Sequence, residues 1–154
     1  MSNSKLLIIN GPGLSDLSSD NVTANEDLSL SGIEQKCIET SGEFGLEVDF
    51  RHNDDQSELL SGLINDINNF DAFIINPAAL SKSSVINYDA FSSAISEISN
   101  QSKPVIEVRI ENIFKRNVSK PLQVPESGLG FIGGLGKHGY VLAIRSINKK
   151  LSNQ

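Results

Sequence analysis

Leu6-Leu-Ile-Ile-Asn-Gly-Pro-Gly-Leu14 is a short apolar run that breaks abruptly into Asn, Gly and Pro. A second segment, Phe73-Ile-Ile-Asn-Pro-Ala-Ala-Leu-Ser-Lys-Ser-Ser-Val85, has the same form. This pattern is typical of a buried parallel strand that ends, at its carboxyl edge, in a functional loop. We therefore expect two central strands whose carboxyl ends open into one cleft.

Strand-like and helix-like patterns alternate along the rest of the chain. The first helix is expected to begin with a capping pair, Ser31 and Glu34, and the second with Asp55 as its N-cap. The first apolar stripe contains Ile33, Cys37, Ile38 and Phe44, with Gly45 at its end, and the second contains Leu59, Leu60, Leu63, Ile64 and Ile67. Strands are predicted at residues 5–10, 46–51, 72–76, 104–108 and 129–132, and further helices at 85–98 and 137–150.

This order of elements predicts an α/β fold of the flavodoxin-like type. It is a three-layer sandwich in which a five-stranded parallel sheet, order 2-1-3-4-5, has helices on both faces. The 154 residues fit one domain, residues 1–154. Within it we expect residues 13–28 to form a mobile lid loop and residues 149–154 a frayed tail.

Composition excludes several classes of function. A net charge of −6, no Trp and two Tyr argue against nucleic acid as a partner. No apolar stretch approaches the roughly 20 residues of a membrane helix, so we expect no membrane partner. A single cysteine, Cys37, in a helical stripe is read as a core residue, and it favours a reducing, cytoplasmic location. His52 and His138 lack metal-ligand spacing, so no metal site is expected.

Four stretches, in order and at matching spacing, resemble a known family. They are Asn10-Gly-Pro12; Ile75-Asn-Pro-Ala-Ala79 with Ser84-Val85 and Asp89-Ala90; Pro104-Val-Ile-Glu-Val108 with Asn112-Ile113; and Gly133-Gly-Leu-Gly136 with Gly139-Tyr140. Over nearly its whole length the chain resembles the type II 3-dehydroquinate dehydratases, or type II dehydroquinases.

The resemblance implies a flavodoxin-like fold and a homo-oligomer, a dodecamer built as a tetramer of trimers. It implies dehydration of 3-dehydroquinate to 3-dehydroshikimate, in the shikimate pathway, with no metal or cofactor. In that family a tyrosinate activated by a lid-loop arginine removes a proton next to the ketone. A water held by an asparagine stabilises the enolate. A histidine, oriented by a glutamate two residues before it, protonates the departing hydroxyl.

The family's acid–base positions are occupied by other residues in this chain. The arginine aligns with Asp20, the tyrosine base with Asn25 and the acid histidine with Arg109. An amide has no proton to lose as a base, and a guanidinium stays protonated and cannot cycle a proton. Residues 13–30 contain neither Tyr nor Arg, so no shift of register restores the base or its activator.

The ligand-binding positions are partly kept. Asn76, Glu107 and Asp89 match the family pattern, and Asp89 would act across a trimer interface. Gly13 stands at an asparagine position, Lys82 at a substrate-binding histidine, and Lys120, or Ser119 in a shorter loop, at the arginine that anchors the substrate carboxylate. The resemblance also gives substrate-binding positions at Ile110 and Glu111.

Structural interpretations of the matching residues stay open. Asn10-Gly-Pro12 is also a common strand-ending turn, and Asn76 could satisfy loop backbone groups instead of a ligand. Glu107 and Arg109 lie two residues apart, on one strand face, and are expected to form an ion pair.

Three functions follow as hypotheses. In the first, the chain has lost the family chemistry and binds a small carboxylate in a cleft where Lys82, Arg109 and Lys120 converge and Asn76 orients the ligand. In the second, it is an active 3-dehydroquinate dehydratase, a lyase, with a rearranged site. In the third, it is a structural subunit of an oligomeric shell and has no ligand.

Overall fold

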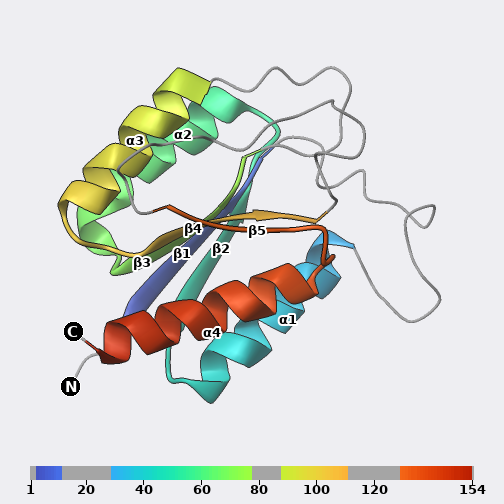
Figure 1. Ribbon diagram of the computed structural model, residues 1–154. Helices are drawn as coiled ribbons and strands as arrows, with labels where there is room; N and C mark the ends of the chain where they lie inside the picture. The colour runs from blue at the N-terminus through green and yellow to red at the C-terminus, as the bar shows by residue number, and fades with distance from the viewer. Residues whose placement is uncertain (1–2, 12–28, 78–87, 111–128, 154) are drawn as a thin grey trace.

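The computed structural model describes residues 3–11, 29–77, 88–110 and 129–153 (Figure 1). The elements follow one another in the order β1 (Lys5–Asn10), α1 (Leu30–Glu43), β2 (Glu47–His52), α2 (Gln56–Asp66), the 3-10 turn η3 (Ile67–Asn69), β3 (Ala72–Asn76), α3 (Tyr88–Asn100), β4 (Val105–Arg109), β5 (Gly130–Gly133) and α4 (His138–Ser152). Every predicted strand is present, with ends shifted by at most one residue.

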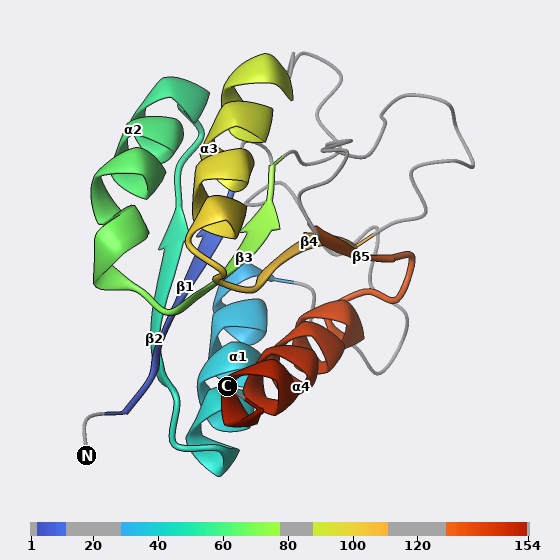
Figure 2. The ribbon, with the colours of Figure 1, turned by 60° about the vertical axis from the view of Figure 1, so that its left-hand side comes forward.

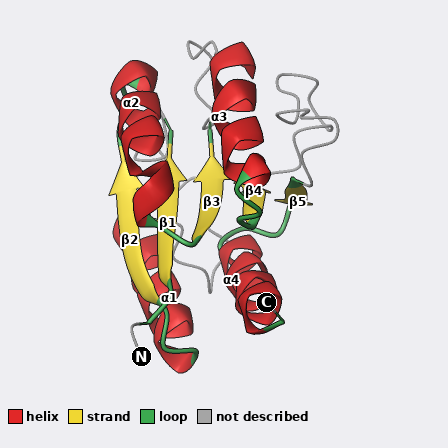
Figure 3. Cartoon of the chain, turned by 90° about the vertical axis from the view of Figure 1, so that its left-hand side faces the viewer, coloured by secondary structure: helices red, strands yellow, loops and turns green. Residues whose placement is uncertain are grey.

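The strands form one parallel sheet in the order β2-β1-β3-β4-β5, which confirms the predicted topology. Helices α1 and α4 cover one face of the sheet and α2 and α3 the other (Figures 1, 2 and 3). This arrangement makes the three-layer α/β sandwich expected from the alternating elements.

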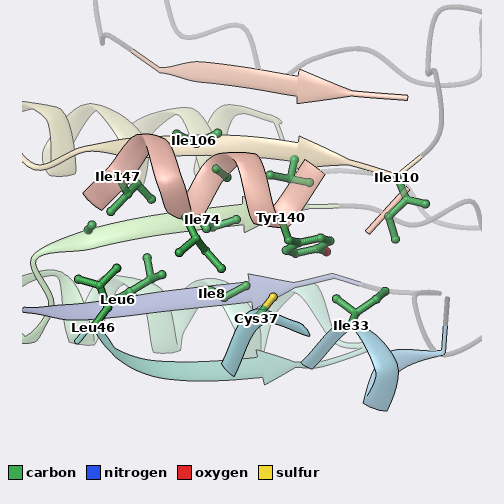
Figure 4. Packing of buried hydrophobic residues seen from close by; sticks show 14 residues of the cluster. Leu6, Ile8, Ile33, Cys37, Leu46, Ile74, Ile106, Ile110, Tyr140 and Ile147 are labelled. Atoms are coloured by element: carbon green, nitrogen blue, oxygen red, sulfur yellow. The ribbon is translucent and has the colours of Figure 1, made fainter. Parts of the chain in front are cut away.

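Alternation along the buried strands divides the core into two clusters. Leu6 and Ile8 of β1 face α1 and α4, whereas Leu7 and Ile9 face α2 and α3. Strand β3 divides in the same way, with Ile74 toward α4 and Ile75 toward α3. Figure 4 shows the first cluster, in which Cys37 of α1 and Tyr140 of α4 pack against β1.

The helix ends correct one prediction and confirm two. Helix α1 is capped by Ser29, whose Oγ accepts a hydrogen bond from the Gly32 N–H at 3.1 Å, so the predicted cap at Ser31 is wrong. Asp55 caps α2 as predicted, with its Oδ1 2.8 Å from the Ser57 N–H. Gly45 follows α1 with φ +69°, a left-handed conformation that favours glycine.

Two members of the predicted stripes lie on the surface. Ile38 is 45% exposed and Ile64 is 54% exposed, so both are outside the core. Each lies next to a buried residue in sequence, Cys37 and Leu63, at the border of an apolar face that covers only part of the helix.

One predicted boundary is corrected, and two predicted segments fall outside the described residues. Helix α4 continues to Ser152 and Leu151 packs against the core, so the tail predicted from residue 149 begins no earlier than residue 153. Residues 85–87, the predicted start of the third helix, and the predicted lid at 13–28 lie outside the described residues. In the described ranges, no helix has the length and apolar character to cross a membrane.

Candidate functional site

The carboxyl ends of β1 and β3 lie side by side, as expected from the two apolar runs that end in Asn10 and Asn76. Asn10 and Asn76, the last residues of the two strands, are direct register partners. The Gly11 N–H donates to the Asn76 carbonyl at 2.7 Å, and the Asn53 N–H donates to the Asn10 carbonyl at 3.1 Å. The backbone at this edge is therefore held in one arrangement across three strand ends.

The two asparagine side chains are joined through a tyrosine. The Asn76 Nδ2 donates to the Tyr140 Oη at 3.0 Å, and the Tyr140 Oη donates to the Asn10 Oδ1 at 2.6 Å. The Asn10 Nδ2 donates to the Arg51 carbonyl at 2.9 Å. We call Asn10, Tyr140 and Asn76 the amide–tyrosine chain. Its three side chains are 0–2% exposed, on the face of the sheet covered by α1 and α4.

The amide–tyrosine chain is electrically neutral, because the phenol of Tyr140 keeps its proton. Burial raises the pKa of the Tyr140 phenol well above its ordinary value, and the Asn76 hydrogen bond offsets only part of that effect. Tyr140 is therefore a hydrogen-bond donor throughout the ordinary pH range. In Figure 4 its ring lies between α4 and β1, with the hydroxyl oxygen toward the carboxyl end of the strand.

One atom at the end of the amide–tyrosine chain is unsatisfied. The Asn76 Oδ1 is buried and has no hydrogen-bond partner among the described residues. Buried polar atoms are nearly always hydrogen-bonded, so an orphan acceptor at a strand end indicates a site for a donor. The Asn76 side chain thus has a structural hydrogen bond through its Nδ2 and one acceptor, its Oδ1, left for a donor.

Glu107 and Arg109 form the ion pair that their spacing predicts. The Arg109 Nε donates to the Glu107 Oε2 at 2.7 Å, and the two side chains are 3% and 0% exposed. Glu107 and Arg109 lie two and four residues after Val105 in the same strand, so their side chains share its face. Val105 packs with α2 and α3. The side chains of Glu107 and Arg109 therefore point to the face of the sheet opposite the amide–tyrosine chain.

The structure thus makes two polar groups at the carboxyl edge instead of one. It brings Asn10 together with Asn76, and Glu107 together with Arg109, but it directs the two pairs to opposite faces. The charge of Arg109 is already offset by Glu107, which weakens its predicted part in a convergence of three cations.

Two other predicted site residues are described. Asp89 lies in the first turn of α3 and is exposed. The Ile110 side chain is buried in the core against α1 and α4, and its carbonyl accepts from the Gly136 N–H at 3.0 Å. A ligand could reach Ile110 only through the backbone. The other predicted residues lie outside the described ranges: Gly13, Asp20, Asn25, Lys82, Glu111, and Lys120 with its alternative Ser119.

The candidate residues named from the sequence lack Asn10 and Tyr140. A tyrosine on an otherwise apolar helix face is a usable signal, because a buried hydroxyl needs partners. Asn10 and Asn76 end adjacent strands in the same phase, so they are the partners that a tyrosine on the covering helix would meet.

Other reactive groups show ordinary structural roles. Burial, and to a smaller degree Glu34, raises the pKa of Cys37 to about 12, so it is a thiol in the core as predicted. Within the described ranges, no group of three or more His, Cys, Asp or Glu side chains is placed to hold a metal ion.

A crevice of about 370 Å³ lies at the amino ends of the strands, away from the two polar groups. It is lined by Ser4, Asp71, Gln101, Ser102, Lys103 and Leu151.

Comparison with known proteins gives one consistent family. The family model for dehydroquinase class II matches residues 4–148. A 3-dehydroquinate dehydratase from Clostridium botulinum (strain Loch Maree / Type A3) is 32% identical over 148 residues, which cover 96% of each chain. A 3-dehydroquinate dehydratase from Endomicrobium trichonymphae is 31% identical over 144 residues, covering 93% of this chain and 96% of that one.

Solved structures give the same result. A 3-dehydroquinate dehydratase-like protein from Bifidobacterium longum is 26% identical, with a TM-score of 0.71 over 96% of this chain and 98% of that one. The type II dehydroquinase from Propionibacterium acnes is also 26% identical, with a TM-score of 0.72 over 96% of this chain and 99% of that one.

Proposed function

Because the chain belongs to the class II dehydroquinase family, we propose that it is a divergent member that binds a small carboxylate without dehydrating 3-dehydroquinate. The ligand site is the family cleft at the carboxyl ends of β1 and β3. No cofactor or metal enters the proposal.

The buried Glu107–Arg109 pair is the observation that carries this proposal. By the family resemblance, Arg109 stands where a histidine acts as acid, and Glu107 where a glutamate orients it. A guanidinium keeps its proton at every relevant pH. In this chain it is also bonded to Glu107 at 2.7 Å, inside the protein. The group at this position therefore serves the fold and supplies no proton to a leaving hydroxyl.

The base side of the reaction is replaced as well. Asn25 at the base position cannot accept and release a proton as a tyrosinate does. Asp20 at the activator position would raise the pKa of a nearby acid, the reverse of what an arginine does. Losing one well-placed acid–base group costs about 10²–10⁴ in rate, and groups that act together fail together.

Ligand binding rests on different residues. The orphan Asn76 Oδ1 supplies an acceptor for a hydroxyl or N–H donor. Lys82 and Lys120 supply positive charge for a carboxylate in a chain of net charge −6. A small hydroxylated carboxylate has both kinds of group, so we assign that ligand class to the site.

A thermal-shift titration with quinate and citrate tests this proposal. Saturating ligand at about 100 times its Kd adds about 2.7 kcal/mol of stability, enough to raise Tm by several degrees. The rise is expected to be lost in Lys82→Ala and Lys120→Ala and kept in Lys149→Ala, where an exposed lysine on α4 is removed as a control. A Tm unchanged by either anion would overturn the proposal and favour the shell subunit without a ligand.

An active 3-dehydroquinate dehydratase is the second candidate. It is favoured by relatives of that name that are 31–32% identical over nearly the whole chain. The two candidates share one fold and one cleft, and they differ in whether the ring hydroxyl of 3-dehydroquinate is eliminated.

Assembly is part of the proposal. The family resemblance favours a homo-oligomer, a dodecamer built from trimers, and Asp89 is exposed on α3, where it could act across a subunit contact. Light scattering should then give a mass near twelve times the 16.7 kDa of the chain. A monomer would remove the intersubunit role of Asp89. A cytoplasmic location stays a prediction.

A further inference from the structure

The direction of every hydrogen bond in the amide–tyrosine chain can be deduced. The Arg51 carbonyl can only accept, so Asn10 must present Nδ2 to it and Oδ1 to Tyr140. The Asn10 Oδ1 in turn needs a proton, and Tyr140 has only one to give. The Tyr140 oxygen is thus left as an acceptor, and Asn76 must present Nδ2 to it.

The consequence falls on the far side of the Asn76 amide. With Nδ2 committed to Tyr140 at 3.0 Å, Oδ1 is directed away from the tyrosine, and it is the buried atom without a partner in the described part of the chain. If the Asn76 amide could rotate by 180°, it could present either its Nδ2 donor or its Oδ1 acceptor to the site. The Arg51 carbonyl of the edge strand β2 fixes every hydrogen bond along the amide–tyrosine chain, and so it fixes which of these two atoms Asn76 presents.

We infer that Tyr140 and Asn10 are positioning residues that hold the amide of Asn76 with its acceptor toward the ligand site. The ligand must then bring a donor, such as a hydroxyl, to this point, and a bare carboxylate gains nothing there. This inference rests on the proposed function for the nature of the ligand, but the orientation of the amide does not depend on it.

The alternative is that Tyr140 only fills space in the core and does not orient Asn76. Tyr140 belongs to the apolar cluster that also contains Cys37, Ile8 and Ile144, and packing alone requires no hydroxyl. Figure 4 shows its ring with Ile8 and Cys37. In that case, loss of the oxygen would change stability but not the choice of ligand. The raised pKa of Tyr140 supports the positioning role, since the phenol remains a donor at any pH used for binding.

The binding test compares two ring carboxylates that differ in their hydroxyls. Quinate and cyclohexanecarboxylate are titrated by calorimetry into the full chain and into Tyr140→Phe. We expect the unaltered chain to prefer quinate, which carries several ring hydroxyls, by about tenfold or more, because one well-made hydrogen bond to Asn76 alone is worth about tenfold. The preference should fall several-fold in Tyr140→Phe. Ile144→Val, a destabilising change in the same cluster on the same helix, is the matched control and should keep it.

Three outcomes decide the binding test. A preference lost in Tyr140→Phe and kept in Ile144→Val supports the inference. An equal preference in all three proteins overturns it, as does an equal loss in both variants, which would indicate general loosening of the core. If neither compound binds the unaltered chain, the proposed function fails, and the decision passes to a measurement without ligand.

That measurement is the NMR signal of the Asn76 side-chain amide, assigned by its absence in Asn76→Ala. A fixed amide that donates to Tyr140 gives one pair of proton signals, one of them shifted and slow to exchange. Tyr140→Phe should remove the shift and speed the exchange, whereas Ile144→Val should do neither. An Asn76 signal unchanged by Tyr140→Phe would overturn the positioning role whether or not a ligand is found.

Discussion

The two polar groups at the carboxyl edge of the sheet are buried to the same degree but differ in what they leave open. Glu107 and Arg109 carry opposite charges and bond to each other on the face of α2 and α3. The amide–tyrosine chain carries no charge and lies on the face of α1 and α4, where its last acceptor has no partner in the described ranges.

The two groups differ in the electrostatic cost of their burial. A charged pair buried at a strand end must be compensated within the protein, and once compensated it is of little use as a proton donor. A neutral hydrogen-bonded chain such as Asn10–Tyr140–Asn76 can leave one acceptor without a partner at a smaller cost in folding free energy than an unpaired charge. In this protein Glu107 and Arg109 of β4 compensate each other, whereas the Asn76 Oδ1 of β3 has no partner in the described ranges.

The largest expected effect is on the charged pair. Arg109→Met leaves the Glu107 carboxylate buried without its ion-pair partner, which should lower the free energy of unfolding by about 3–5 kcal/mol in a urea titration. The double variant Glu107→Gln with Arg109→Met removes both charges and should recover most of that loss. A single variant as stable as the unaltered chain would show that the pair does not serve the fold.

Breaking the amide–tyrosine chain should lower the free energy of unfolding by less than breaking the charged pair does. Tyr140→Phe removes one hydroxyl and orphans a donor on Asn76 and an acceptor on Asn10, for a loss of about 1–3 kcal/mol by urea titration. An increase in stability would contradict the hydrogen bonds assigned to Tyr140.

The same variant has a signature in alkaline solution. The pKa of Tyr140 is raised in the folded protein above its ordinary value of 10.0, so the unfolded chain loses this proton first. The contribution of the Tyr140 phenol to the free energy of unfolding is fully present below pH 10 and is lost as pH rises through its pKa in the folded protein. Tyr140→Phe should therefore have a flatter stability profile above pH 10 than the unaltered chain. Identical slopes would mean that the phenol titrates freely.

The smallest effect should come from an ion pair near the surface. Asp66 accepts from Asn69 at 2.8 Å and pairs with Arg51 at 2.6 Å, and these two contacts, in that order, lower the pKa of Asp66. Its contribution is present above the ordinary pKa of 3.8 and lost as pH falls through the folded pKa. Asp66→Asn should cost less than about 1 kcal/mol at pH 7 and reduce the loss of stability in acid.

Two controls sharpen this comparison. Glu43→Gln breaks a 3.8 Å contact with Arg145 between side chains that are more than half exposed, and it should change nothing measurable. Asp66→Asn should also leave the Asn76 amide signal intact, because Asn10 is held by the carbonyl of Arg51 and not by its side chain. A loss in Asp66→Asn as large as that in Arg109→Met would remove the contrast between buried and exposed pairs.

The sheet was predictable from sequence because buried parallel strands are continuous apolar runs with abrupt ends. The runs ending at Asn10 and Asn76 gave the central strands and their neighbouring carboxyl ends. The spacing of Glu107 and Arg109 gave their ion pair, since residues two apart in a strand share a face. These features depend on contacts that are local in the chain or fixed by topology.

What the sequence could not give depends on long-range packing. Tyr140 is 64 residues from Asn76 and 130 from Asn10, and their contact appears only when α4 is laid on the sheet. Ile38 and Ile64 fit apolar stripes, but the neighbouring helices and strands do not reach their side of the helix. The cap at Ser29 instead of Ser31 was a choice between two serines of equal propensity.

The most direct test of the proposed loss of dehydratase chemistry is turnover of 3-dehydroquinate, followed by the absorbance of the conjugated product. The Clostridium botulinum 3-dehydroquinate dehydratase, 32% identical, serves as the positive control under the same conditions. We predict a rate for this chain lower than that of the control by at least about 10⁴, consistent with the joint loss of acid and base. A value of kcat/KM within tenfold of the control would contradict the account and establish an active dehydratase with a rearranged site.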